Sequence, residues 1–303
     1  MSQAETVVST APLAPTRRRL AEGFVVGAWQ AGPCEARGAL CDLFAAWPRG
    51  RQGTGRAPYL LKLPRTECQS DPRALALLER EAEVGRQVTH PHLISVLDAG
   101  IQGADRFVVL PYLEGATLAE ILAEGQPLPL MLVLWLARQA AQALQALHAA
   151  NWLHMDLKPA NLHVSPRGHL TLLDLGFARR TTAERSVDDA ILGTPAYLAP
   201  EALAPALPID ARSDLYSLGV VLFELLTHRR PFEGDSVAEV LERHRRAPPP
   251  DPRAIAPAAP RALAELVRSL LAKEPLRRPQ SAAELADQLV RLEIAAFAES
   301  WCE

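Results

Sequence analysis

Residues 154–161 read His-Met-Asp-Leu-Lys-Pro-Ala-Asn, and they place a carboxylate, an ammonium and an amide in one short segment. Asp174-Leu175-Gly176 begins eighteen residues after Asp156. Residues 193–201 then read Gly-Thr-Pro-Ala-Tyr-Leu-Ala-Pro-Glu. Each motif is weak by itself, because an Asp-Leu-Gly triplet also occurs in ordinary turns. The three together, in this order and at this spacing, form a specific pattern.

Two short apolar runs lie between the first and second motifs. Residues 162–164 and 170–173 are typical of two short strands joined by a turn. A hairpin at this place would bring Asp156 and Asp174 close together. The sequence therefore predicts one site to which both carboxylates belong.

The rest of the chain divides into a strand-rich part and a helix-rich part. Short apolar runs between Gly- and Pro-bearing turns predict strands at 24–26, 40–44, 59–63, 93–97 and 107–110. One helix is predicted among them, at 72–88. Apolar periodicity predicts further helices at 117–122, 128–149, 214–226, 237–244, 261–272 and 281–294.

Composition excludes several classes of protein. The chain has 303 residues, of which 49% are hydrophobic, and a net charge of −3. This is the balance of a globular protein rather than a disordered or fibrous one. The 32 Lys and Arg residues nearly cancel the 35 Asp and Glu residues, so no overall field favours nucleic acid. The longest apolar run, at 128–137, is shorter than the roughly 20 residues of a membrane span, and we expect no such span.

The cysteines indicate a reducing environment. Cys34, Cys41, Cys68 and Cys302 show neither a zinc-site spacing nor a disulfide framework. Residues 1–19 are polar and are not followed by the apolar region of a signal peptide. We therefore expect free thiols and a cytoplasmic location.

The three motifs resemble the catalytic loop, the metal-binding loop and the substrate-side loop of the protein kinase family. The resemblance is to eukaryotic-like (Hanks-type) serine/threonine kinases, and the Ala-, Pro- and Arg-rich composition suggests a bacterial one. It implies an α+β, bilobal fold with a small β-rich N-lobe and a larger α-helical C-lobe. The implied boundaries are a flexible leader at 1–19, a kinase domain at 20–292 and a short tail at 293–303. Within the domain, the N-lobe would end near residue 110, the hinge would be 111–115 and the C-lobe 116–292.

The resemblance gives roles to the polar residues of the motifs. Asp156 would accept the proton of the substrate hydroxyl, and Lys158 would lie over the γ-phosphate of ATP. Asn161 and Asp174 would hold Mg²⁺, because a hard cation prefers carboxylate and amide oxygens. Lys158 and Thr194 together are similar to the serine/threonine branch of the family rather than the tyrosine branch.

The strand-rich part would supply the other contacts to ATP. Lys62 resembles the family's phosphate-binding lysine, and Glu81 resembles the glutamate that pairs with it. Glu83 is the alternative partner. We prefer Glu81 because it lies nearer the apolar stripe of its predicted helix.

The junction between the two parts resembles the family's gatekeeper and hinge, with Leu110 as the gatekeeper. Adenine would hydrogen-bond to the carbonyl of Pro111, which is available because proline lacks only the N–H. The backbone N–H and carbonyl of Leu113 would make the other contacts.

The phosphate-binding loop departs from the family pattern. The family carries G-x-G-x-x-G here, whereas only Gly32 and Gly38 remain within residues 30–38. Gly32 is the glycine that we expect at the phosphates. Pro33 removes a backbone N–H, and Glu35 adds a negative charge near the triphosphate. This departure favours weaker ATP binding.

A second departure is Met155, which replaces an arginine that in many kinases pairs with a phosphorylated activation loop. Methionine cannot make that pair. We therefore expect activity without phosphorylation of Thr181, Thr182 or Ser186.

Three functions are compatible with this pattern. The first is an ATP- and Mg²⁺-dependent kinase acting on a protein substrate, with a separate regulatory protein as a possible partner. The second is a pseudokinase, a binding or scaffolding module, as the altered loop favours. The third is a small-molecule phosphotransferase, against which residues 174–201 argue because they resemble a peptide-docking platform. The kinase is preferred because all five polar site positions carry the expected residue types. They are Lys62, Glu81, Asp156, Asn161 and Asp174.

Overall fold

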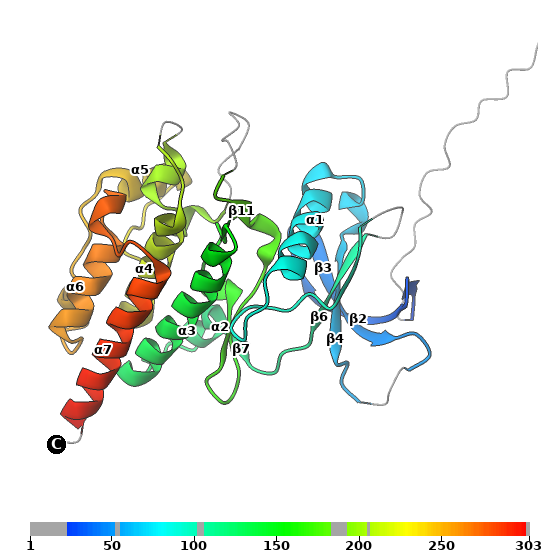
Figure 1. Ribbon diagram of the computed structural model, residues 1–303, viewed down its shortest axis with the longest axis horizontal. Coiled ribbons are helices and arrows are strands. Elements are labelled where there is room, and N and C mark those ends of the chain that lie inside the picture. The colour runs from blue at the N-terminus through cyan, green and yellow to red at the C-terminus, as the bar shows by residue number, and fades with distance from the viewer. Residues whose placement is uncertain (1–22, 52–54, 102–105, 183–192, 205–206, 301–303) are drawn as a thin grey trace, which may run out of the picture.

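The computed structural model describes residues 23–51, 55–101, 106–182, 193–204 and 207–300. Within these residues the chain forms a small sheet-based lobe and a larger helical lobe, which Figure 1 shows side by side. The predicted α+β bilobal fold is therefore confirmed. The leader expected at 1–19 lies outside the described residues, as does Ser186.

An antiparallel six-stranded sheet, in the order β1-β2-β3-β4-β6-β5, forms the smaller lobe. Its strands are β1 (Val25–Val26), β2 (Trp29–Arg37), β3 (Cys41–Pro48), β4 (Tyr59–Pro64), β5 (Asp98–Gly100) and β6 (Phe107–Pro111). On one face, Leu61 and Leu63 of β4 are buried with Phe44 and Val109. Because side chains alternate along a strand, Lys62 points to the opposite face.

The predicted strand at 93–97 is wrong, because these residues form a connection and the strand is β5 instead. Leu93 and Ile94 are buried, and the Ile94 N–H donates to the carbonyl of Leu172 in the larger lobe at 2.9 Å. Their apolar character therefore reflects packing between the lobes rather than membership of the sheet.

Residues 30–38, which we expected to form a phosphate-binding loop, lie mostly in β2. The pairing of β2 with β3 shifts register between Ala31 and Cys34 and again between Cys34 and Ala36. Pro33 lies within the first shift, where a missing N–H breaks no ladder hydrogen bond. The strand thus continues past the proline.

Helix α1 (Pro72–Gln87) lies beside the sheet, between it and the larger lobe (Figure 1). Asp71 caps the helix by accepting a hydrogen bond from the Arg73 N–H at 2.8 Å. Pro72 occupies the first turn, where a missing N–H costs nothing. The buried side chains of α1 are Ala74, Leu78, Glu81, Ala82 and Val84.

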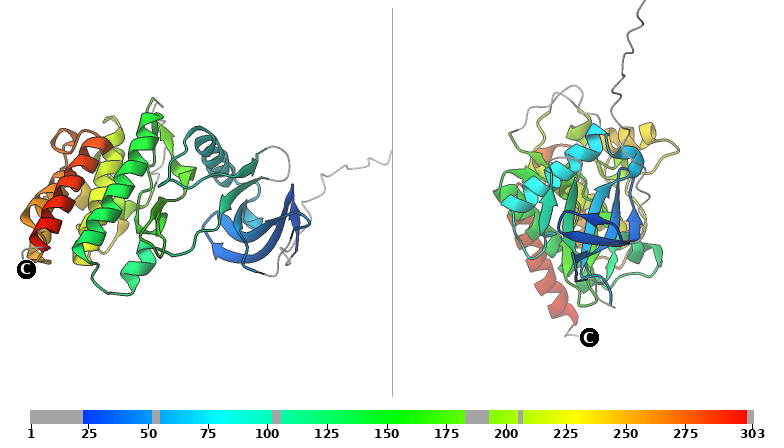
Figure 2. Two further views of the ribbon diagram at one scale, coloured as in Figure 1. Left: turned by 60° about the horizontal axis from the view of Figure 1, so that its bottom comes forward. Right: turned by 90° about the vertical axis from the view of Figure 1, so that its right-hand side faces the viewer.

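The larger lobe is built around one long apolar helix. Its helices are α2 (Leu118–Ala123), α3 (Leu130–Ala149), α4 (Ala211–Thr227), α5 (Val237–Arg246), α6 (Arg261–Leu270) and α7 (Ala282–Ser300). Helix α3 packs against α4 and α7, and the left view of Figure 2 shows these helices on the side of the molecule away from the six-stranded sheet. By length and hydropathy alone α3 could cross a membrane, but here it is a core helix.

Helix α7 is longer than predicted. The sequence pattern ended it at residue 294 and left 293–303 as a tail, whereas the helix continues to Ser300. Glu293 pairs with Arg138 Nε of α3 at 2.8 Å, which ties this part of α7 to the lobe.

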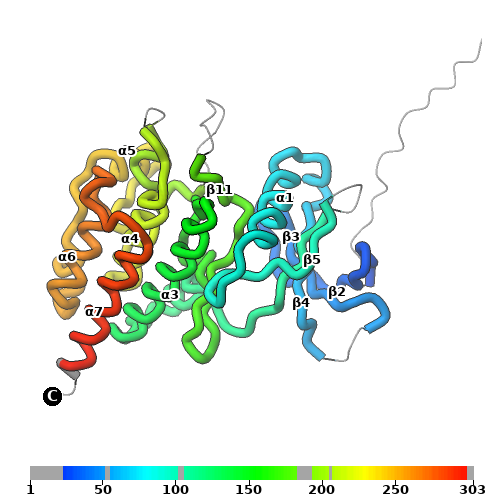
Figure 3. The backbone as a smooth tube through the Cα atoms, viewed as in Figure 1, coloured from blue at the N-terminus to red at the C-terminus, as the bar shows by residue number. Residues whose placement is uncertain are grey.

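Short strands carry the site residues into the space between the lobes. A three-stranded sheet joins β7 (Ala116–Thr117), β9 (Leu162–Val164) and β10 (Leu170–Leu172), and a two-stranded sheet joins β8 (Trp152–Leu153) to β11 (Arg179–Arg180). The predicted hairpin between the first two motifs is β9 paired antiparallel with β10. In Figure 3 the backbone leaves the sheet after β6 and enters the larger lobe.

Candidate active site

A cavity of about 280 Å³ lies between the two lobes. Leucines of both lobes and of the connection between them form its apolar wall, namely Leu43, Leu60, Leu110, Leu113 and Leu173. Lys62, Glu81 and Asp174 form a charged cluster in its lining. A cavity with an apolar wall and a lysine in its charged cluster suits a flat, partly apolar ligand with an anionic tail.

Lys62 is the centre of an ion-pair triad. Its Nζ lies 2.6 Å from Glu81 Oε2 and 2.9 Å from Asp174 Oδ1. Burial acts to lower the pKa of Lys62, but the charges of Asp174 and Glu81 outweigh it and raise that pKa above its usual value. Burial likewise acts to raise the pKa of Asp174, and the Lys62 ammonium lowers it on balance. The site therefore holds a fixed cation beside an ionised Asp174.

Glu81, and not Glu83, faces Lys62. Burial raises the pKa of Glu81 in spite of the Lys62 charge, because this side chain is fully enclosed. Residues two apart on a helix point in different directions. Glu83 is exposed and lies 3.3 Å from Arg180 Nη2.

The expected place of Gly32 is wrong. Gly32 lies inside β2, where a Cβ atom would be 2.7 Å from the Trp47 ring, so the glycine serves strand packing and is not at the cavity. Gly38 forms the turn after β2, donating its N–H to the Cys41 carbonyl at 2.9 Å. Glu35 of the same hairpin lines the cavity.

Asp156 is held by donors from two of the three motifs. Its Oδ1 accepts from the N–H and the hydroxyl of Thr194, both at 2.8 Å. Its Oδ2 accepts from Lys158 Nζ at 2.6 Å and from Asn161 Nδ2 at 3.1 Å. Lys158 Nζ also donates to Thr194 Oγ1 at 2.8 Å. The four residues form one cluster with a buried carboxylate at its centre.

Asp214, in the first turn of α4, fixes the backbone of this loop. It accepts from the N–H groups of His154 and Met155 at 2.8 and 2.9 Å and from His148 Nε2 at 2.8 Å. Burial acts to raise the pKa of Asp214, but the hydrogen bond and charge of His148 outweigh it, so the pKa is lowered. Met155 has a φ of 69°, a strained value for this residue type, and the ionised Asp214 holds it there.

Gly193 allows the third motif to reach Asp156. Its φ is +105°, and a Cβ atom there would lie 2.6 Å from the Met155 carbonyl oxygen. Any other residue would be strained by its backbone and would clash. The close approach places Thr194 over the Asp156 carboxylate.

The remaining hydrogen-bonding groups fit a nucleotide and a hard cation. Among the described residues, the backbone N–H and carbonyl of Leu113 have no hydrogen-bond partner. Asn161 donates through Nδ2 to the Asp156 carbonyl at 2.7 Å, which leaves its Oδ1 free, and the Asp174 side chain is 32% exposed. The described residues contain no cluster of three or more His, Cys, Asp or Glu that could hold a metal alone. Asn161 Oδ1 and the Asp174 carboxylate are oxygen donors of the kind that Mg²⁺ prefers.

A second cluster, not predicted from the sequence, joins α1 to the segment after Asp174. Arg180 Nη2 donates to Gln87 Oε1 at 2.7 Å, and its guanidinium lies 4.0 Å from the centre of the Trp152 ring. Trp152 is buried, and its Nε1 donates to the same Gln87 oxygen at 3.1 Å. We name Arg180, Trp152 and Gln87 the α1 clamp. A tryptophan two residues before the first motif is the one sequence signal that could have pointed to it.

A buried ion pair supports the third motif. Arg278 Nη1 and Nη2 lie 2.6 and 2.8 Å from the two carboxylate oxygens of Glu201. Ser213 of α4 donates its hydroxyl to the same carboxylate at 2.7 Å. The pair fixes the end of the motif to the helical core.

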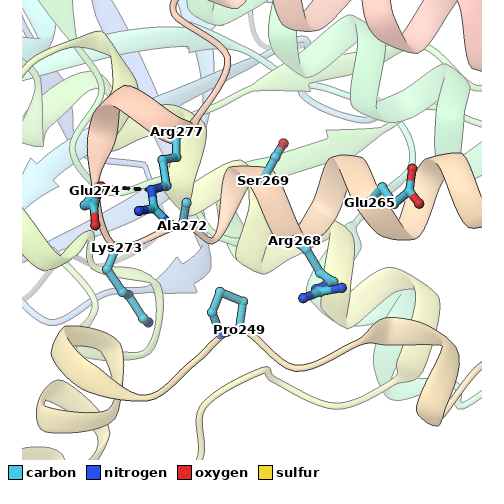
Figure 4. Close-up of a pocket in the computed structure, with 8 residues that line it drawn as sticks. All are labelled: Pro249, Glu265, Arg268, Ser269, Ala272, Lys273, Glu274 and Arg277. Atoms are coloured by element: carbon cyan, nitrogen blue, oxygen red, sulfur yellow. Dashed lines mark ion pairs between the residues drawn. The ribbon is translucent and has the colours of Figure 1, made fainter.

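A larger cavity, of about 410 Å³, lies in the helical lobe around Arg268 and Lys273 (Figure 4). Its charged side chains are largely occupied: Glu274 pairs with Arg277 at 2.9 Å, and Lys273 Nζ donates to the His244 carbonyl at 2.7 Å. None of the three motifs contributes to it. The cavity between the lobes is therefore the candidate active site.

The chain matches the protein kinase domain over residues 54–290. It is 34% identical over 268 residues to a probable serine/threonine-protein kinase of Streptomyces coelicolor, covering 86% of this chain and 39% of that protein. It is 36% identical over 239 residues to the serine/threonine-protein kinase PknB of Mycobacterium tuberculosis, covering 77% and 38%. A serine/threonine-protein kinase of Myxococcus xanthus is 36% identical over 249 residues, covering 77% and 45%.

The chain thus spans about two fifths of the length of the curated relatives it matches. The matched region nevertheless runs from the start of β4 in the smaller lobe through most of the larger lobe and contains all three motifs. The chain therefore belongs to the protein kinase family, and within that family it is similar to the bacterial serine/threonine kinases of the Hanks type.

Proposed function

We propose that this chain transfers the γ-phosphate of ATP, with Mg²⁺, to a serine or threonine hydroxyl of a protein. One observation carries the proposal. The Thr194 hydroxyl lies 2.8 Å from Asp156 Oδ1 and 2.8 Å from Lys158 Nζ. A substrate hydroxyl has the same chemistry, and the same two contacts would position it for attack.

Asp156 would orient the substrate hydroxyl and hold its proton at a carboxylate oxygen, while the new P–O bond forms and the bond from the γ-phosphorus to the leaving ADP oxygen breaks. Lys158 would neutralise charge on the transferred group. Phosphoryl transfer depends more on positioning and charge neutralisation than on covalent help from the protein. Both side chains are already oriented by hydrogen bonds, so little reorganisation is needed during the reaction.

The other groups would bind the nucleotide. Lys62, fixed by Glu81, would contact the phosphates that are not transferred. Asn161 Oδ1 and the Asp174 carboxylate would hold Mg²⁺, which when bound neutralises phosphate charge. Leu113 would offer its free backbone N–H and carbonyl to the base.

The three relatives reported above are named as serine/threonine-protein kinases, which supports this activity. The chain spans only part of the length of these relatives. We therefore also propose that its substrate is a protein and that a separate regulatory protein is its partner. Among the described residues, Cys34, Cys41 and Cys68 are free thiols, which supports a cytoplasmic location.

We further propose that activity does not require phosphorylation of Thr181, Thr182 or Ser186. Met155 offers no charge to a phosphate. The α1 clamp supports the idea, because it ties β11 to the C-terminal end of the helix that carries Glu81. The cation–π contact and the hydrogen bonds of the α1 clamp would thus hold β11 against α1, without the phosphate–arginine pair that many kinases use.

The test of transfer uses the purified chain with γ-labelled ATP, Mg²⁺ and a generic basic protein, beside Asp156→Asn. We expect label on serine or threonine, reduced about 10²–10⁴-fold in the variant, the range for loss of a general base. Absence of transfer, with no thermal shift on adding ATP and Mg²⁺, would instead support the scaffolding alternative.

The test of phosphorylation independence replaces Thr181, Thr182 and Ser186 together with alanine. We expect the transfer rate to stay within about twofold of the wild-type rate. Loss of activity in the triple variant, restored by acidic residues at the same positions, would contradict the proposal.

A further inference from the structure

Lysine is rare in this chain. Of its 32 Lys and Arg residues only three are lysine, namely Lys62, Lys158 and Lys273. An arginine supplies a permanent charge, whereas a lysine amine can also lose its proton and act as a nucleophile. Lys62 and Lys158 belong to the site between the lobes, where each pairs with a carboxylate. Lys273 lies after α6 and lines the other cavity, in the helical lobe.

Uncharged groups surround the ammonium of Lys273. Its Nζ lies 3.8 Å from the centre of the Phe232 ring and donates to the His244 carbonyl at 2.7 Å. The contacts with the Tyr216 hydroxyl and the Arg243 carbonyl are longer, at 3.3 and 3.4 Å. Within the part of the chain that the structure describes, no carboxylate pairs with this ammonium. Lys273 thus lacks the partner that stabilises the charge of the two other lysines.

The surroundings of Lys273 favour the neutral amine. Burial, and then the charge of Arg278, lower the pKa of Lys273 to about 7. Arg278 Nη2 donates to the Lys273 carbonyl at 3.3 Å, and the Glu201 carboxylate is paired with Arg278. At pH 7 about half of the Lys273 side chains would be neutral, against about one in 2,500 for a lysine with the usual pKa of about 10.4. Only the neutral amine has a lone pair for attack.

A second cation lies in the cavity of about 410 Å³ that Lys273 lines. The carboxylates of this cavity, on Glu265 and Glu274, each pair with a nearby arginine, at 2.8 and 2.9 Å. Arg268 lines the same cavity and has no ion-pair partner among the described residues. Figure 4 shows Lys273 and Arg268 on either side of Pro249. The cavity therefore combines one amine with one unpaired guanidinium.

An amine near an unpaired guanidinium suits an acyl donor that carries negative charge. An acyl phosphate is such a donor, because its carbonyl carbon is bonded to a phosphate that is also the leaving group. Arginine binds phosphate oxygens through its planar fork of N–H groups. The volume of the cavity lies in the range of small-molecule sites.

We propose that Lys273 is a covalent modification site, acylated by an acyl phosphate whose phosphate group binds Arg268. The neutral Nζ attacks the carbonyl carbon, and the new C–N bond forms while the C–O bond to the phosphate breaks. Inorganic phosphate leaves with the electron pair of that bond, and the proton released by the nitrogen passes to water. The product carries a neutral amide in place of the ammonium.

The test compares the three lysines within one folded chain. The purified chain is incubated at pH 7 with acetyl phosphate, without ATP or Mg²⁺, beside N-acetyl-lysine amide as an exposed reference amine. Acetylation at each lysine is followed over time by peptide mapping and mass spectrometry. The same reaction in concentrated urea measures the unfolded chain.

We expect Lys273 to be acetylated at least tenfold faster than Lys62, Lys158 and the reference amine. Its rate should rise with pH through a midpoint near 7, whereas the midpoint of the reference amine lies near about 10.4. Unfolding should abolish the difference between the three lysines. Equal rates in the folded chain, or a preference for Lys273 that persists in the unfolded chain, would overturn the proposal.

The variant Arg268→Gln tests the phosphate contact. We expect it to slow acetylation of Lys273 by acetyl phosphate about 1.4- to 5-fold, the range for an exposed charge pair. Acetylation by p-nitrophenyl acetate, an ester without a phosphate, should be unchanged. Arg291→Gln is the matched control, because Arg291 is exposed on α7 and lies outside the cavity, and it should change neither rate.

Thermal unfolding verifies that both variants are folded. An equal effect of Arg268→Gln on the two acyl donors, or no effect on either, would overturn the assignment of an acyl phosphate.

Discussion

Replacing Arg180 with alanine is expected to loosen the contact between α1 and the larger lobe. The guanidinium donates to Gln87 Oε1 at 2.7 Å and lies 4.0 Å from the Trp152 ring centre. Because Arg180 is 37% exposed and Glu83 46% exposed, their ion pair contributes less than about 1 kcal/mol. The cation–π contact adds about 0.5–1 kcal/mol. A total loss of about 0.5–2 kcal/mol shifts the docking equilibrium of α1 by roughly 2- to 30-fold.

The effect should appear in catalysis, because docking of α1 places Glu81 against Lys62. We expect kcat/KM to fall by up to that factor and the free energy of unfolding to fall by no more than about 2 kcal/mol. Hydrogen exchange of the α1 backbone amides should speed up by a similar factor. A loss of global stability alone would speed up exchange in other elements as well as in α1.

The matched control is Arg86→Ala. Arg86 lies in the last turn of the same helix, is exposed and has no ion-pair partner among the described residues. It should leave both readouts unchanged. An Arg180→Ala variant with wild-type kcat/KM and wild-type exchange in α1 would refute the clamp as the device that positions Glu81.

Three further predictions follow from single contacts. Arg278→Met removes the guanidinium from the buried Glu201 carboxylate, so denaturant unfolding should show a loss of about 3–5 kcal/mol; a loss below about 1 kcal/mol would contradict a stabilising role for this ion pair. Burial, and then the nearby Lys273 charge, lowers the pKa of His244 to about 4. Because the unfolded chain binds that proton below its ordinary value of 6.5, stability should fall by about 3 kcal/mol from pH 6.5 to 4. His244→Gln should flatten this dependence, and equal pH slopes for variant and wild type would count against it. Gly193→Ala should reduce kcat at least tenfold with the fold retained, since its Cβ would lie 2.6 Å from the Met155 carbonyl oxygen; an active variant would show that this approach is not needed.

The catalytic cluster could be predicted from the sequence because its members lie in short motifs of fixed spacing. Asp156, Lys158 and Asn161 share one loop. The short β9–β10 hairpin connects that loop to Asp174 and so brings Asp174 back beside it. The choice of Glu81 over its neighbour followed from helical periodicity alone. These predictions needed only local geometry.

The parts that could not be predicted depend on tertiary packing. The apolar run at 93–97 has the composition of a strand, but the place where it packs is set by the larger lobe. The local sequence predicts a loop glycine at Gly32, because nothing local indicates that the Trp47 ring lies against it. His163 occupies an ordinary strand position, and only the folded structure shows that its imidazole lines the cavity between the lobes.

The central claim is that Lys62, Asn161 and Asp174 form one site for a nucleotide and its cation. Calorimetric titration of ATP with and without Mg²⁺ tests it most directly, on the wild-type chain and on Asp174→Asn. We predict that Mg²⁺ strengthens ATP binding to the wild type at least tenfold and that this gain disappears in the variant. Binding that is indifferent to Mg²⁺, or a gain of equal size in Asp174→Asn, would contradict the account.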